Sequence, residues 1–170
     1  KYDIFSTSQS NWNNNNNKKF ILFDLINESY NSLINVVKPN VILHCAAITN
    51  LDYCEKFPDE SLKLNAYSVK KFLQLDEKIK LLFISSDAVF SDDVHLPNEN
   101  TITDPLNMYG KSKEIGERFI QKKGQPHSAI RTTIVGKNIN DQKISFVEWI
   151  FNSISNGKKI TLFDDVLFSP

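Results

Sequence analysis

The chain has 170 residues, of which 41% are hydrophobic and 24% are charged, as in ordinary globular domains. Lys and Arg together number 20, as do Asp and Glu, so the charge balance argues against a nucleic-acid binder with its basic excess. No apolar run has the length of a membrane span, and the first ten residues lack a signal-peptide core. Cys45 and Cys54 do not form a CxxC pair and the three histidines are scattered, which predicts a reduced, cytoplasmic protein without a metal site.

Short apolar runs alternate with segments of helical periodicity along the chain. Strands are expected at residues 2–6, 20–23, 41–47, 81–84, 128–135 and 160–163, and helices at 29–37, 58–75, 111–121 and 146–154. The apolar run 41–47 suits a strand that is covered on both faces, as in a parallel sheet. This alternation predicts an α/β fold, namely a doubly wound, mostly parallel sheet of Rossmann type.

Glycine is missing from the part of the chain where such a sheet normally needs it. A dinucleotide-binding sheet opens with a strand, a glycine-rich turn and a helix. All five glycines of this chain lie at residue 110 or beyond, so we expect the first strand and the glycine-rich turn to be absent from it. Without that strand, the sheet should expose an edge or leave a gap at its centre.

A tyrosine and a lysine four residues apart form the first candidate for chemistry. Tyr109 and Lys113 would share one face of a helix. A nearby ammonium lowers the pKa of a tyrosine, ordinarily near 10, so that the hydroxyl can exchange a proton with a carbonyl or alcohol. Tyr67 and Lys71 have the same spacing, so the pattern alone also fits a surface pair. Context favours Tyr109, because the strand before it ends at Ser86, where a hydroxyl on the ligand-binding edge could hold a substrate oxygen.

Two other segments follow predicted strands. Ala46 and Ala47 end an apolar run, and small residues there let a flat ligand approach the backbone, although tight helix–sheet packing explains them equally well. Asp24 follows the strand at 20–23. Its carboxylate could accept a hydrogen bond from an adenine amino group or serve as a helix-cap or loop acid.

Taken together, these segments resemble the extended short-chain dehydrogenases, and most closely the RmlD-like dTDP-4-dehydrorhamnose reductase branch. Residues 83–90 resemble the family's ISTDYVF segment, 105–113 its PxxxYGxxK motif and 130–132 its LRT strand. Residues 38–52, 64–66 and 163–170 resemble further segments of the family in the same order. Each motif is common by itself, but the ordered set is specific.

The resemblance implies a role for each matching residue. Ser86, Tyr109 and Lys113 would form the catalytic set, with Ser86 where the family usually has threonine, and Ser86 and Asp87 would contact the sugar. The cofactor, NADPH or NADH, would supply the hydride. The absence of an acid at residues 6–8 favours NADPH. The residues expected to bind it are Thr7, Asp24, Leu25, Ala47, Ile48, Thr49, Ile84, Tyr109 and Lys113.

Two departures from the family pattern leave the exact sugar open, since Ala88 replaces a usual tyrosine and Ile134 a frequent tryptophan. The resemblance also implies one partial NAD(P)-binding domain over residues 1–170, in which 137–170 lead into a largely missing substrate domain.

The leading expectation is an NAD(P)H-dependent reductase of a 4-keto nucleotide-sugar. The alternatives are an epimerase or dehydratase of the same superfamily, and a non-catalytic NADP-binding regulatory subunit like that of methionine adenosyltransferase. The expected partner is a small nucleotide-sugar, with neither nucleic acid nor membrane, and a homodimer is left open.

Overall fold

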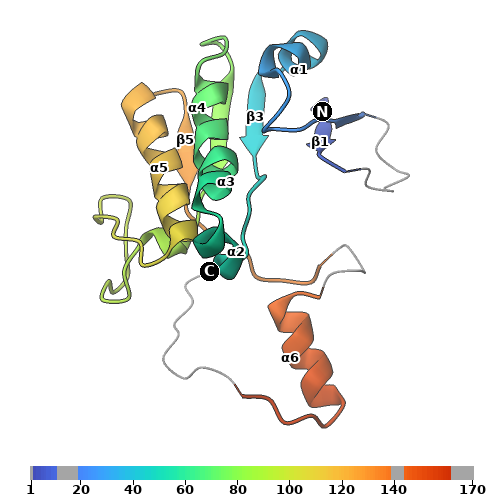
Figure 1. Cartoon of the computed structure of the whole chain (residues 1–170), viewed down its shortest axis with the longest axis vertical. Coiled ribbons are helices and arrows are strands. Elements are labelled where there is room, and N and C mark those ends of the chain that lie inside the picture. Colours follow the sequence, from blue (N-terminus) through green and yellow to red (C-terminus); the bar gives the residue numbers. More distant parts are fainter. Residues whose placement is uncertain (1, 11–18, 139–143, 162–170) are drawn as a thin grey trace. The chain divides into compact units, whose positions relative to one another are not determined.

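The computed structural model describes residues 2–10, 19–138 and 144–161, and the chain divides into two compact units (Figure 1). The first unit is Lys1–Arg131 and the second is Thr132–Pro170. Among the described residues, no helix combines the length and the apolar character that crossing a membrane requires.

Two small parallel sheets form the framework of the first unit. β1 (Ser6–Ser8) pairs with β2 (Phe20–Leu22), and β3 (Val41–His44), β4 (Lys80–Ile84) and β5 (Ser128–Ile130) form the second sheet in that order. Helices connect β2 to β3, β3 to β4 and β4 to β5, which confirms an α/β fold with parallel strands. Within the described residues β1 and β3 do not pair with each other, so each sheet has an open edge there.

The helices of the first unit are short except for the one that carries Tyr109. They are α1 (Tyr30–Val37), α2 (Leu51–Lys56), α3 (Pro58–Leu62), the π-helical turn η1 (Lys63–Tyr67), α4 (Ser68–Leu73), the 3₁₀ turn η2 (Asp87–Val89) and α5 (Met108–Lys123). The second unit contains α6 (Phe146–Ser155), which Ser145 and Glu148 begin with a capping box. In Figure 1, α4 and α5 lie side by side, and these two helices also contact each other.

The core lies between one face of the three-stranded sheet and helices α1, α4 and α5. A continuous series of ring contacts runs through it, from Phe23 to Tyr30, Phe72, His44 and Phe83, with centroid separations of 5.6, 4.6, 5.2 and 5.7 Å in turn. Edge-on ring pairs of this kind add to the stabilisation from burial alone. The series joins the end of β2 to the middle of the second sheet.

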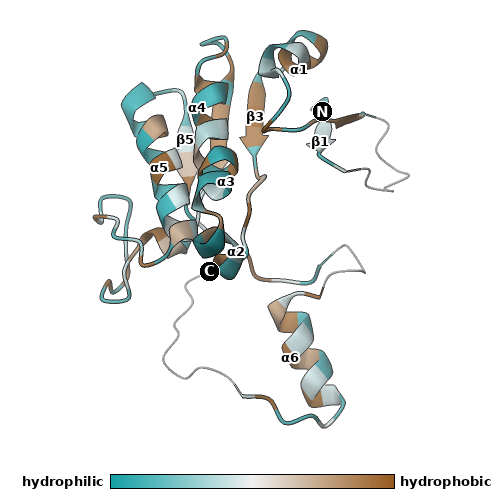
Figure 2. Ribbon diagram, in the orientation of Figure 1, coloured by the Kyte–Doolittle hydropathy of each residue, from teal (hydrophilic) through white to brown (hydrophobic). Residues whose placement is uncertain are grey.

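The opposite face of the three-stranded sheet is open within the first unit. Val41 and Leu43 on β3 are 50% and 59% exposed, while His44 is buried. Figure 2 shows the hydrophobic colouring of β3. The expectation that residues 41–47 are covered on both faces is therefore wrong for this unit, and the strand itself ends at His44.

Several other predicted boundaries are wrong. The first strand is Ser6–Ser8 rather than 2–6, because the parallel pairing places Ser6 opposite Phe20, and Tyr2 and Ile4 are exposed. The strand expected at 128–135 ends at Ile130.

The helix expected at 58–75 is interrupted by η1, and α2 precedes it where no helix was predicted. The helix expected at 111–121 begins earlier, at Met108, because Asn107 caps it. The strand expected at 160–163 lies partly outside the described residues, and Ile160 is not in a strand.

Candidate active site

Gly110 brings the first turn of α5 against η2. A Cβ atom added to Gly110 would lie 2.1 Å from the carbonyl oxygen of Ala88, well inside contact distance. Asn107 fixes the same turn from the other side, because its side-chain oxygen accepts a hydrogen bond of 2.8 Å from the Gly110 amide. A glycine at this position therefore permits the close approach that places Tyr109 beside the segment after β4.

The close approach of α5 to η2 brings Tyr109 next to Ser86. The Ser86 hydroxyl donates to Asp87 Oδ1 at 2.9 Å and accepts from the Ala88 amide at 3.2 Å. Burial raises the pKa of Tyr109 above its usual value, whereas its hydrogen bond with Ser86 opposes this shift. The expectation of a lowered pKa is wrong for the protein alone, since burial outweighs any nearby positive charge. A protonated hydroxyl at neutral pH is the form that can donate a proton.

Lys113 lies one turn further along α5 and is almost fully buried, with 2% of its surface exposed. Its ammonium sits 4.2 Å from the centroid of the Phe83 ring. Burial lowers the pKa of Lys113 to about 8, and the fields of Cys45 and Glu117 act in the opposite direction. Lys113 thus has a pKa close to neutral pH and lies on the same helix face as Tyr109.

Asn65 connects the loop after β3 to the first turn of α5. Its amide oxygen accepts from the Ile48 amide at 2.8 Å, and its amide nitrogen donates to the Ile48 carbonyl at 2.9 Å and to Ser112 Oγ at 2.9 Å. Ser112 Oγ donates in turn to the Tyr109 carbonyl at 2.6 Å. Asn65 is fully buried and lies in the π-helical turn η1, a feature that is frequent at functional sites.

The loop after β3 and the residues around Lys113 fit the nicotinamide end of a dinucleotide. Ala47 and Ile48 are half-buried and Thr49 is exposed, so the loop presents small and backbone groups at the carboxyl end of β3. Within the described part of the chain, the Lys113 ammonium donates no hydrogen bond, which leaves its donors for a ligand hydroxyl. Ile84 is the last residue of β4 and pairs with Ile130.

The expected adenine end forms a separate group at the ends of β1 and β2. Asp24 accepts from the Ile26 amide at 2.8 Å, from Asn27 Nδ2 at 2.8 Å and from Gln9 Nε2 at 3.3 Å. These hydrogen bonds lower the pKa of Asp24 below its usual value. They are typical of an acidic side chain that stabilises a loop. Leu25 accepts from the Tyr30 hydroxyl through its carbonyl.

Thr7 is exposed in β1. Among the described residues, no hydrogen bond or ion pair joins Thr7, Asp24 or Leu25 to the Ser86–Tyr109 group.

The competing tyrosine–lysine pair lies elsewhere. Tyr67 packs beside Phe119 with 6.3 Å between ring centroids, and Lys71 donates to the Ile26 carbonyl at 3.3 Å. Neither residue hydrogen-bonds to Ser86.

Sequence reasoning missed three polar residues that hold helix α5 in place. Glu55 accepts a hydrogen bond of 2.6 Å from the Met108 amide at the start of α5, and Glu117 pairs with Arg131 further along. The only sequence signal for Glu117 was its position four residues after Lys113. In the described ranges, no group of three or more His, Cys, Asp or Glu residues could hold a metal ion.

The sequence pattern of the RmlD substrate binding domain matches residues 15–170 of this chain. The chain belongs to the RmlD substrate binding domain family. This match confirms the family predicted from the sequence motifs. The matched residues include Ser86, Tyr109 and Lys113 of the site described above.

Two kinds of relatives resemble this chain: subunits of methionine adenosyltransferase and a dTDP-4-dehydrorhamnose reductase. Methionine adenosyltransferase 2 subunit beta of Xenopus laevis is 28% identical over 149 residues, which cover 86% of this chain and 45% of that protein. The dTDP-4-dehydrorhamnose reductase of Salmonella typhimurium is 35% identical over 112 residues, covering 63% of this chain and 38% of that enzyme. This chain spans about half the length, or less, of these relatives.

The fold agrees with a solved reductase of the same family. The dTDP-4-dehydrorhamnose reductase of Bacillus anthracis, solved in complex with NADP, has a TM-score of 0.70 and 27% sequence identity to this chain. The similarity covers 81% of this chain and 51% of that protein.

Proposed function

We propose that the complete gene product reduces a 4-keto nucleotide-sugar with NADPH or NADH, in the manner of a dTDP-4-dehydrorhamnose reductase. The observation that carries this proposal is the Tyr109 hydroxyl near enough to Ser86 for that hydroxyl to act on its pKa, one helical turn from the buried Lys113. Family membership and the NADP complex of the Bacillus anthracis relative support it.

Each of the three side chains has a distinct task in this reaction. Ser86 holds the sugar carbonyl oxygen, and Tyr109 donates its proton to that oxygen as the carbonyl carbon accepts a hydride. The nicotinamide supplies that hydride when bound. Lys113 stabilises the tyrosinate that remains until solvent returns the proton. Asp87, which accepts a hydrogen bond from Ser86, would contact the sugar.

The cofactor would extend from this group toward the ends of β1 and β2. Ala47, Ile48 and Thr49 would line the dinucleotide beside Ile84, and Asp24, Leu25 and Thr7 would receive the adenosine part. The absence of an acid at the end of β1 favours NADPH.

The open edges of β1 and β3 support a proposal about the rest of the sheet. In the Rossmann strand order, the first strand lies between the strands that correspond to β1 and β3. We propose that the complete gene product supplies that strand and its glycine-rich turn, that residues 1–170 form part of the NAD(P)-binding domain, and that 137–170 lead into a largely missing substrate domain.

A pair of matched tyrosine variants tests the proposal. In the complete gene product, Tyr109→Phe should lower the rate of NADPH oxidation with dTDP-4-dehydrorhamnose by roughly 10²–10⁴-fold. Tyr67→Phe, at the other tyrosine–lysine pair, should leave the rate within a factor of about two. Unchanged turnover in Tyr109→Phe would refute the assignment.

A second candidate is a non-catalytic subunit, favoured by the 28% identity to methionine adenosyltransferase 2 subunit beta over 86% of this chain. On this alternative, the protein binds NADPH and forms a stable complex with a methionine adenosyltransferase catalytic subunit. Size-exclusion chromatography of the two purified proteins distinguishes it, provided that no keto-sugar reduction is detected in the same preparation.

A further inference from the structure

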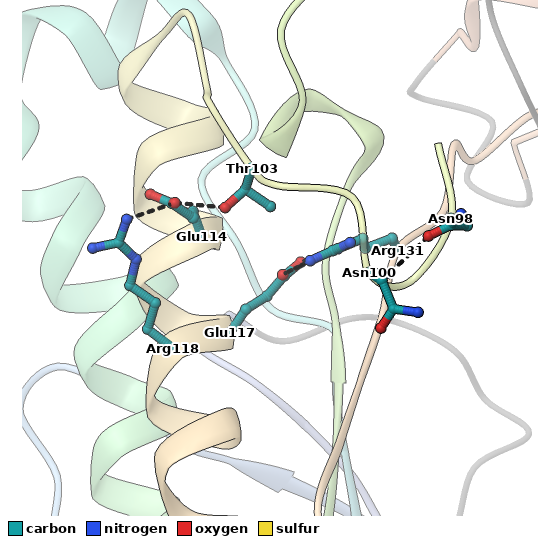
Figure 3. A network of polar contacts seen from close by, with 7 residues as sticks. All are labelled: Asn98, Asn100, Thr103, Glu114, Glu117, Arg118 and Arg131. Carbon is teal, nitrogen blue, oxygen red and sulfur yellow. Dashed lines mark hydrogen bonds and ion pairs between the residues drawn. The ribbon is translucent and has the colours of Figure 1, made fainter. Parts of the chain in front are cut away.

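A buried ion pair lies one turn beyond Lys113 on α5. Glu117 receives three hydrogen bonds from Arg131, two from Nε at 3.2 and 3.1 Å and one from Nη2 at 2.8 Å. The Glu117 side chain is 3% exposed and that of Arg131 19%. Figure 3 shows the two side chains pointing toward each other between α5 and the segment after β5. The Arg131 guanidinium also lies over the Phe90 ring, which restricts its orientation.

The pair is close enough to Lys113 to affect its charge. Residues four apart on a helix have neighbouring side chains, so the Glu117 carboxylate lies on the Lys113 side of α5. Gly116, between them, packs against the Phe83 ring, where an added Cβ would come within 2.9 Å of two ring carbons. Lys113 itself is only 2% exposed, and interactions between charges are stronger where water is excluded.

We propose that Glu117, held in place by Arg131, is a positioning residue that keeps the buried Lys113 side chain in its ammonium form beside Tyr109. This inference rests on the proposed role of Lys113 in the reduction. Burial by itself would favour neutral lysine, and a neutral amine could not stabilise a tyrosinate. Arg131 holds the Glu117 carboxylate in place through its three hydrogen bonds.

The other groups that surround Lys113 come from β3, β4 and α5. From the end of β3, Cys45 favours the ammonium only as a thiolate, and burial raises the pKa of the Cys45 thiol. His44 is neutral near pH 7 because its pKa is about 4. From α5 itself, Tyr109 is protonated, and from β4 the Phe83 ring contributes no net charge. Glu117 therefore provides the nearby carboxylate whose field favours the Lys113 ammonium.

The pKa of Lys113, measured by NMR, tests the proposed role of Glu117 directly. The complete gene product would be labelled with ¹³C-lysine, and the Lys113 signal would be assigned by its loss in Lys113→Arg. In the wild type, the signal should titrate near pH 8. In the double variant Glu117→Gln/Arg131→Met, which removes both charges, the midpoint should move down by about one pH unit.

A neighbouring glutamate supplies the matched control. Glu114 is also buried on α5, but it bonds to Thr103 and pairs with Arg118 (Figure 3). It is not among the groups that act on Lys113, so Glu114→Gln should leave the Lys113 midpoint unchanged. If the double variant does not fold, Glu117→Gln alone serves, because an unopposed Arg131 cation should lower the midpoint further.

An unchanged Lys113 midpoint in the Glu117 variants would overturn the proposal, because the carboxylate would then have no effect on the ammonium. The measurement uses no substrate, so its result is independent of turnover. Failure of the proposed reductase function would appear as unchanged turnover in Tyr109→Phe. Failure of the Glu117 proposal would appear as an unchanged Lys113 midpoint in the Glu117 variants.

Discussion

The buried histidine at the end of β3 makes stability depend on pH. His44 Nε2 lies 2.7 Å from Ser68 Oγ, and the Ser68 hydroxyl donates to the Leu64 carbonyl, so His44 is the donor and carries its proton on Nε2. Burial, and secondarily the field of Lys113, lower the pKa of His44 from 6.5 to about 4. His44 is therefore neutral in the folded protein at pH values where an unfolded chain binds a proton.

The sign and size of the effect follow from this difference. Between pH 6.5 and 4, the unfolded state binds more protons at this site, so stability is lost as the pH falls. The full loss is roughly 3 kcal/mol below pH 4, and about 1.4 kcal/mol is already lost at pH 5.5. For an m value near 2 kcal/mol/M, the urea midpoint should then fall by about 0.7 M between pH 8 and pH 5.5.

Urea unfolding of the complete gene product at these two pH values measures the effect. His44→Asn replaces the imidazole with an amide that does not titrate, so this variant should lose most of the pH-dependent shift, whatever its stability at pH 8. His95→Asn, at an exposed histidine, should behave as the wild type. The pKa of His127 is also lowered by burial, and this accounts for a residual slope of the same sign. Equal pH dependence in wild type and His44→Asn would refute the reasoning.

Two further predictions concern the packing around Tyr109. Gly110→Ala places a Cβ 2.1 Å from the Ala88 carbonyl oxygen, so α5 must move and turnover should fall by at least about tenfold; normal kinetics in this variant would show that the close approach is not required. Asn65→Leu leaves the Ile48 amide and carbonyl without their side-chain partner and should lower the free energy of unfolding by about 2–4 kcal/mol in urea titrations. Ser112→Ala, which leaves both bonds between Asn65 and Ile48 in place, should lose less, and equal losses in the two variants would contradict this account.

Local signals in the sequence were enough to predict the elements that carry the site. The strand around Leu81 and the helix after Tyr109 have apolar patterns that do not depend on distant residues, and the structure contains both. The order of strands and helices likewise predicted parallel pairing. The position of Tyr109 after the strand that ends at Ser86 selected it over Tyr67, a choice that the Tyr109→Phe and Tyr67→Phe variants test.

The remaining features depend on contacts between residues far apart in the chain. Gly110 has an ordinary place in a helix, and its importance becomes visible only when Ala88 is seen against it. Glu117 and Arg131 are separated by 14 positions, and no local pattern pairs them. The direction of the Tyr109 pKa shift was predicted wrongly for the same reason, because burial depends on how the whole unit packs.

The fate of the hydride tests the central claim most directly. The complete gene product would be incubated with dTDP-4-dehydrorhamnose and NADPH deuterated at C4 of the nicotinamide, and the sugar product analysed by mass spectrometry and NMR. Our account predicts one deuterium at C4 of the reduced sugar, stoichiometric formation of NADP⁺, and loss of both in Tyr109→Phe. Bound NADPH that is never oxidised, or a sugar product without deuterium, would contradict it.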